Sequence, residues 1–219
     1  MGLRTFRALL SLVTLTVCLG ADGQHPAATV SFTFDFPGAN PSHYGIVVAN
    51  DGHGSYSSNG KFDDKSDPAD PEPLQFAVSE SVRSQIFDLA KRAHYFSGKV
   101  DSGNKNIANT GAKTLAYKDD SHNSQATYNY SPLQPVGQLT SLFQNLSTTM
   151  EFGRRLVYFH KYEKLALDDQ LKRMEEMQRD NGVGDVQAIA PVLKDIANDS
   201  SVMNVSRARA LRLLANAGK

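Results

Sequence analysis

The chain has 219 residues, of which 40% are hydrophobic and 21% charged, and its 23 basic residues equal its 23 acidic ones in number. This composition is ordinary for a globular protein with one sizeable core, and it argues against intrinsic disorder. The near-neutral balance gives no electrostatic reason to expect nucleic acid or an anionic membrane as a partner. The local clusters of arginine are interpreted as solvated helix faces: Arg154, Arg155, Arg207, Arg209 and Arg212.

The N-terminal segment has the layout of a secretory signal peptide. Arg4 and Arg7 precede an apolar run at 8–19, and small, polar residues follow at 20–23. This order predicts a signal peptide at 1–23. The apolar run is shorter than the roughly 20 residues of a spanning helix, so we expect an exported protein, periplasmic or secreted, with no integral membrane span.

Cys18, the only cysteine, lies inside this apolar run. Cleavage after it would leave a chain without disulfides, stabilised by its core alone. In an alternative interpretation, Cys18 is the lipidated first residue of a lipoprotein. Val17 is a poor residue before such a cleavage site, which disfavours this alternative.

The first half of the chain predicts strands and then a helix. Residues 29–36 alternate between apolar and polar, which is typical of a strand buried on one face. A hairpin follows at 44–57, with turn residues at 50–52, and then a short strand at 74–78. The stretch from Val78 to Phe96 is predicted to be a single amphipathic helix.

This helix would bury Val82, Ile86, Leu89 and Ala93, which recur at spacings of four, three and four. Ser79 is the expected N-cap, since its hydroxyl can accept a hydrogen bond from the first turn. Gly98 stands just beyond the end, where a left-handed residue commonly closes a helix.

A second hairpin and a second helix follow. Residues 114–117 and 126–130 alternate around a polar turn at 119–124, and an apolar stripe runs from Val136 to Leu146. Antiparallel hairpins bury one face of a common sheet, so both helices should cover that face. The predicted fold class is α+β, a two-layer sandwich of hairpins and two helices.

The last third has the composition of a helical appendage. Residues 151–179 are predicted to form one long helix, with pairs four residues apart on its exposed side. Two short helices are expected at 186–197 and 202–215. The predicted division is therefore an α+β domain at 24–149 and an all-α appendage at 150–219. The expected ion pairs of the long helix are Asp168 with Lys172, Asp169 with Arg173, and Glu175 with Arg179.

Two connections are unusually long, at 59–73 and 97–111. The first is rich in acidic residues and proline and is interpreted as a mobile, solvated linker. Its carboxylates could suggest calcium, but their spacing does not fit an EF-hand loop. The histidines show no metal-ligand spacing, so neither a metal nor a cofactor is predicted.

One weak set of candidate catalytic residues remains. His53, Asp119 and His122 all lie near hairpin turns. If the turns were neighbours, the three side chains could form a hydrolase-type site together with the two long loops.

Several phrases resemble a group of uncharacterised exported proteins from acidobacterial-type bacteria. They are VSFTFDFPG at 30–38, LAKRAHYFSG at 89–98, ATYNYSP at 126–132 and EFGRRLVYFH at 151–160. The resemblance covers most of the chain after residue 23. It implies export, but it carries no activity, cofactor or catalytic residue that could be transferred.

Three functions are left open. The first is a non-enzymatic binding or structural module of the cell envelope, whose open sheet face or helical appendage binds a macromolecule, with protein as the favoured partner. The second is the hydrolase-type enzyme with its site at the loops and hairpin turns. The third is an inhibitor or chaperone-like binder, for which an exposed apolar patch on the appendage would be the sign.

Overall fold

The computed structural model describes residues 27–62 and 73–217. The predicted signal peptide at 1–23, with Cys18, lies outside the described residues. So does most of the acidic connection, at 63–72.

The sheet is a single layer of six strands in the order β4-β3-β2-β1-β5-β6. Every neighbouring pair is antiparallel. β1 is central, with Phe32 opposite Ile46 of β2 on one side and Leu115 of β5 on the other. The strand bounds are Thr29–Asp35 (β1), His43–Ala49 (β2), His53–Ser58 (β3), Leu74–Ala77 (β4), Ala112–Lys118 (β5) and Asn123–Tyr128 (β6).

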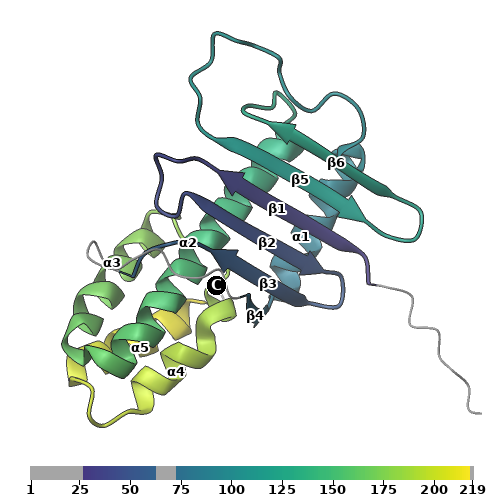
Figure 1. Ribbon diagram of the computed structural model, residues 1–219. Helices are drawn as coiled ribbons and strands as arrows, with labels where there is room; N and C mark the ends of the chain where they lie inside the picture. Colours follow the sequence, from purple (N-terminus) through teal and green to yellow (C-terminus); the bar gives the residue numbers. More distant parts are fainter. Residues whose placement is uncertain (1–26, 63–72, 218–219) are drawn as a thin grey trace, which may run out of the picture.

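The described residues also form five α-helices, at Glu80–Arg92 (α1), Gln134–Tyr162 (α2), Leu167–Arg179 (α3), Ala190–Asn198 (α4) and Asn204–Asn216 (α5). Short 3-10 turns lie at His94–Phe96 (η1), Lys164–Ala166 (η2) and Val186–Ile189 (η3). Figure 1 shows α1 and α2 behind one face of the sheet, with α3, α4 and α5 gathered around the C-terminal half of α2. The predicted α+β fold class, with a helical C-terminal part, is confirmed. None of the described helices is both long and apolar enough to cross a membrane.

The core lies between the sheet and these two helices. In β1 the side chains of Val30, Phe32 and Phe34 are buried, as the alternation predicted. The Phe32 ring stacks on Phe143 of α2, with 5.3 Å between ring centroids. On α1, Ile86 is fully buried. The residues predicted from the strand alternation and those predicted from the helical spacing therefore lie in one core.

The start of α1 differs from the prediction. Ser79 does occupy the N-cap position, but its hydroxyl makes no capping hydrogen bond. Instead its backbone N–H donates to Oδ2 of Asp185 at 2.6 Å, which ties the helix start to the turn before η3. Beyond the helix, Gly98 has φ +87°, in the left-handed region expected of it.

The second helix is longer than the sequence predicted. α2 continues through 147–149, beyond the apolar stripe that ends at Leu146 and across the predicted division at residue 149. The hydroxyls of Ser147 and Thr148 donate to the backbone carbonyl of Gln144 at 2.9 and 3.1 Å, so these side chains are accommodated within the helix. The predicted boundary between residues 149 and 150 therefore lies inside one continuous helix.

The long helix predicted at 151–179 is broken. Glu163 adopts φ −143° and ψ 61°, which ends α2, and α3 begins only at Leu167 after a 3-10 turn. The prediction of a single helix was wrong because both halves carry the same helical periodicity, and only the backbone at Glu163 separates them.

A buried carboxylate fastens α2 to β3. Glu151 is 6% exposed, and its Oε1 accepts hydrogen bonds from Tyr56 at 2.8 Å, Ser58 at 2.5 Å and Arg154 at 2.8 Å. A Cβ at Gly60 would clash with the other carboxylate oxygen, so this position suits glycine. Burial and the charge of Glu151 raise the pKa of Tyr56 far above its usual range, which keeps the phenol protonated as a donor. The prediction that Arg154 lies on a solvated face was wrong.

A second charge network joins α3 to α5. Arg209 donates to Asp168 at 2.9 Å and to Glu175 at 2.5 Å, and Arg212 donates to Glu175 at 2.8 Å. Asp168 and Glu175 thus pair between helices rather than with residues four positions along α3. Arg209 and Arg212 are part of this helix-to-helix contact and not a freely solvated face.

We expect Glu151→Ala to lower the free energy of unfolding by about 3–5 kcal/mol, because Arg154 and the Tyr56 hydroxyl would stay buried without their acceptor. Urea denaturation followed by far-ultraviolet circular dichroism measures this loss. Glu176→Ala removes an exposed glutamate of α3 and should change the unfolding free energy by no more than about 0.5 kcal/mol. Equal effects of the two substitutions would contradict the assigned role of Glu151.

Candidate functional site

The structure does not bring the three candidate catalytic residues together. The turns after β2 and β5 lie at the same end of the sheet, because both strands pair with β1 up to Thr29. However, β2 and β1 lie between β3 and β5, which places His53 about 14 Å, or three strand spacings, from Asp119. His53 instead pairs with Asp51 of its own turn, with 3.1 Å between Nδ1 and Oδ1. Only Asp119 and His122 meet.

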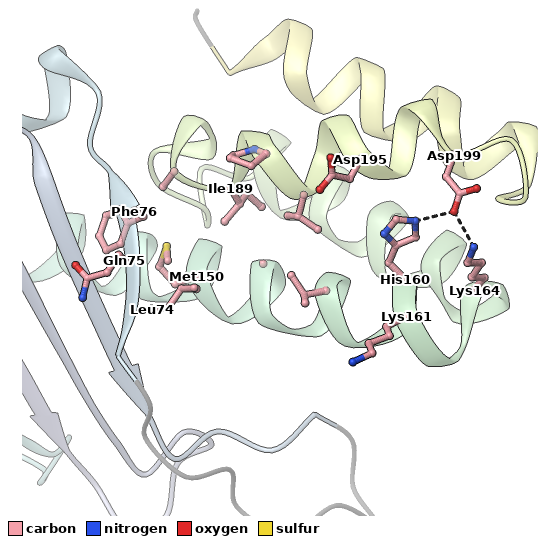
Figure 2. A pocket seen from close by; sticks show the side chains of 15 residues that line it. Leu74, Gln75, Phe76, Met150, His160, Lys161, Lys164, Ile189, Asp195 and Asp199 are labelled. Atoms are coloured by element: carbon pink, nitrogen blue, oxygen red, sulfur yellow. Dashed lines mark hydrogen bonds and ion pairs between the residues drawn. The ribbon is translucent and has the colours of Figure 1, made fainter.

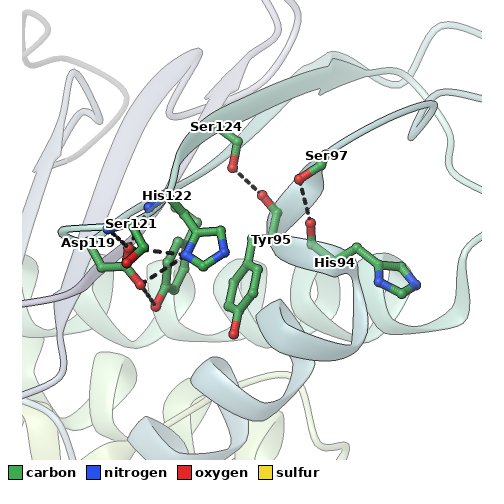
Figure 3. A network of polar contacts seen from close by, with 8 residues as sticks. His94, Tyr95, Ser97, Asp119, Ser121, His122 and Ser124 are labelled. Atoms are coloured by element: carbon green, nitrogen blue, oxygen red, sulfur yellow. Dashed lines mark hydrogen bonds and ion pairs between the residues drawn. The ribbon is translucent and has the colours of Figure 1, made fainter.

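Asp119 organises the turn between β5 and β6 (Figure 3). The backbone amides of Ser121 and His122 donate to its Oδ1 at 2.7 and 2.6 Å, and the Tyr117 hydroxyl donates to Oδ2 at 2.9 Å. Desolvation works against the carboxylate, but these hydrogen bonds outweigh it and lower the pKa of Asp119 to about 2. The geometry is that of a carboxylate that caps a hairpin turn.

A left-handed turn packs against this hairpin. His94, Tyr95 and Phe96 have φ values of +50°, +54° and +65°, so the predicted helix from Val78 to Phe96 ends early, at Arg92. Left-handed backbone costs a non-glycine residue about 1–2 kcal/mol. Such strain persists only where surrounding contacts impose it.

Aromatic packing supplies those contacts. The Tyr95 ring lies 4.2 Å from the His122 ring and 4.5 Å from the Tyr117 ring, measured between centroids. The Ser124 hydroxyl donates to the Tyr95 carbonyl (Figure 3). Asp119 and His122 therefore belong to a corner that anchors the end of α1 on the hairpin, and a structural role accounts for each polar contact.

The 97–111 connection does not complete a site at this corner. From Asp101 onward it lies at the opposite end of β5, where Asp101 accepts the Asn129 amide at 3.0 Å and Asn129 accepts the Thr110 amide at 2.9 Å. Lys113 Nζ donates to the carbonyls of Gly111 and Asn129 at 3.1 and 3.0 Å, which fastens the same loop. The seven residues of β5 separate it from the hairpin turn by about 20 Å, so this connection does not meet Asp119 and His122.

A groove between the sheet edge and the helical part is the stronger candidate site. It has a volume of about 620 Å³ and lies between β4 on one side and α2, η3 and α4 on the other. Figure 2 shows Phe76, Met150 and Ile189 around a common space. The apolar side chains that line the groove are Leu74, Phe76, Met150, Val157, Ile189 and Val192.

The floor and the walls of this groove differ in how tightly they are packed. A Cβ at Gly153 would stand 2.6 Å from Cγ2 of Ile189, so glycine lets η3 approach α2 closely at the groove floor. Leu74 and Val157, on opposite walls, remain 39% and 55% exposed. Their apolar surface is available to a ligand because no described segment covers it.

A polar cluster closes one end of the groove. Asp199 Oδ2 accepts hydrogen bonds from Lys164 at 2.7 Å and His160 at 2.9 Å (Figure 2). Its Oδ1 accepts the Ser201 hydroxyl at 2.6 Å. The bonds from Lys164, Ser201 and His160 hold the pKa of Asp199 well below its usual range. An Asp–His pair can orient a general base. Here the Ser201 hydroxyl donates to Asp199 rather than to His160, so the cluster has no paired nucleophile and base.

No family model matches the sequence, and no curated protein matches it significantly. The resemblance to uncharacterised exported proteins stays a prediction.

Within the two described segments, no group of three or more His, Cys, Asp or Glu side chains is placed to hold a metal ion.

Asp119→Asn should destabilise the protein near neutral pH and much less in acid. The folded pKa of about 2 lies below the ordinary 3.8, so ionised Asp119 contributes stability above about pH 4 that is lost toward pH 2. Thermal melting at a series of pH values checks this. We expect the gap in Tm between wild type and variant to narrow between pH 4 and pH 2, whereas Asp180→Asn, at an exposed aspartate, should show no such narrowing.

His94→Gly should stabilise the protein by about 0.5–1 kcal/mol, because glycine adopts the left-handed backbone without strain and the lost side chain is exposed. Lys91→Gly, at an exposed position inside α1, should instead destabilise by about 1 kcal/mol. Denaturant titration compares the two variants. A loss of stability in both would show that residue 94 is not held in a left-handed conformation.

Proposed function

We propose that this chain is an exported, non-enzymatic binding protein that holds an extended apolar segment of a partner protein in the groove beside β4. One observation carries the proposal: an open apolar groove runs along the edge strand of the sheet. Export itself is expected from the sequence at 1–23.

The edge strand supports an extended peptide as the occupant. β4 pairs with β3 through residues such as Phe76, opposite Gly54, and no described strand pairs with its outer side. A free edge offers backbone N–H and C=O groups to an added strand, while pockets beside it accept alternate side chains. Leu74 and Val157 stand on either side of the position such a strand would take.

The size and charge of the groove fit an apolar occupant. A volume of about 620 Å³ lies within the roughly 300–1,000 Å³ of typical ligand sites. At the polar end, the charge of Asp199 is offset by Lys164, so this end does not favour a strongly charged segment. The same groove would suit an inhibitor or a chaperone-like binder, since its helical wall exposes apolar surface as those functions require.

Val157→Glu should weaken peptide binding at least about tenfold, because it places a charge on the apolar wall of the groove. We would select extended peptides from a display library on the mature protein and measure affinity by fluorescence anisotropy. Val205→Glu changes a comparably exposed valine of α5, outside the groove, and should bind as wild type does.

Backbone recognition gives a second, independent readout. In an added strand, every second amide N–H faces β4 and the others face away. Methylation of the amide nitrogens that face β4 should abolish binding of a selected peptide, and methylation of the other amide nitrogens should be tolerated. Equal affinity for both methylated peptides would contradict strand addition. A different result would assign the groove to an amphiphile: the library yields no peptide, and a dansyl-labelled fatty acid binds the wild type but not Val157→Glu.

A further inference from the structure

A second pocket lies on a different face of α2 from the groove. It has a volume of about 480 Å³ and is bounded by the turn at 40–41, the chain at 61–62, α2 and α3. Its apolar part is largely aromatic and includes Phe62, Phe152 and Phe159. Its polar part includes Lys61, Arg155, Gln170 and Arg173, and the carboxylate of Glu151 also lines it.

Arg155 is the unusual residue of this pocket. Its guanidinium lies over the Phe152 ring, with 4.8 Å from Cζ to the ring centroid, and its buried Nε has no hydrogen-bond partner. Burial lowers the pKa of Arg155; Glu151 opposes this effect and the like charge of Arg173 reinforces it. A buried donor without an acceptor is rare in native proteins, and this one belongs to a residue that lines a pocket.

The nearby carboxylate does not serve as that partner. Oε1 of Glu151 already receives Tyr56, Ser58 and Arg154. Arg209 shows the contrast, because it is paired with two carboxylates of α3. In the described part of the chain, neither Arg155 nor Arg173 hydrogen-bonds to a carboxylate.

We propose that this pocket binds the oxyanion of a small organic ligand, a phosphate or a carboxylate group, between Arg155 and Arg173. Guanidinium groups present paired N–H donors in a planar fork that matches both oxyanions. Lys61 adds positive charge at the same pocket, and phenylalanine and methionine side chains form its apolar part. An oxyanion here offsets the positive charge that Lys61, Arg155 and Arg173 bring to the pocket and relieves the repulsion between the two arginines.

Isothermal titration calorimetry of the mature protein with phenyl phosphate and with benzoate tests this site, with sodium chloride at equal ionic strength as the blank. We expect saturable binding of at least one ligand with a Kd below about 1 mM. The two arms distinguish a phosphate ligand from a carboxylate ligand. Because this pocket and the groove use different faces of α2, peptide binding should not change when the pocket is filled.

Arg173→Gln should weaken this binding about tenfold, since one charge-assisted contact is lost from an exposed side chain that the fold does not need. Arg179→Gln removes the same charge from an exposed position farther along α3 and should leave the affinity unchanged. Arg173→Lys should recover part of it. Absence of saturable binding by either ligand, or equal affinity in wild type and Arg173→Gln, would overturn the proposal.

Discussion

The buried carboxylate of Glu151 determines how the two layers of this protein meet. A carboxylate removed from water must be hydrogen-bonded, and here Tyr56, Ser58 and Arg154 provide the donors. These bonds hold α2 against β3. Since β4 pairs only with β3 among the described strands, the distance between β4 and α2, and with it the apolar groove, follows from the same contact. Arg155, one turn along α2, then faces the second pocket.

Local periodicity in the sequence predicted most of the fold. The alternation through Val30, Phe32 and Phe34, and the spacing around Ile86 on α1, report burial directly because strand and helix geometry place such residues on one face. The ends of helices were harder to predict. The hydroxyls at 147–149 bond to the backbone one turn earlier and continue α2. The backbone at Glu163, a charged residue on the apolar seam, ends α2 inside a stretch that was predicted to be one helix.

The candidate sites could not be predicted in the same way, because their residues are distant in sequence. Arg154 and Ser58 are 96 positions apart, and His160 and Asp199 are 39 apart, so no spacing rule connects them. Arginines near one another on a helix resemble a solvated face until a partner from another element is known. At the hairpin turns, by contrast, residues that were considered together do not meet. The weak candidate set required the turns of His53 and Asp119 to be neighbours, but the strand order places the central β1, together with β2, between their strands.

Both proposed sites work against folding stability, which is the physical reason to assign them to binding. Partly exposed apolar groups such as Leu74 and Val157 gain only part of the stabilisation that full burial would give. An unpartnered Nε on Arg155 forfeits a hydrogen bond that water would supply in the unfolded chain. The contact between α3 and α5 shows an arginine of this chain paired at a helix-to-helix contact, because Arg209 forms ion pairs with two carboxylates. Apolar surface left open at a strand edge, and cations left unpaired beside aromatic rings, are therefore best explained by occupants that bring the missing contacts with them.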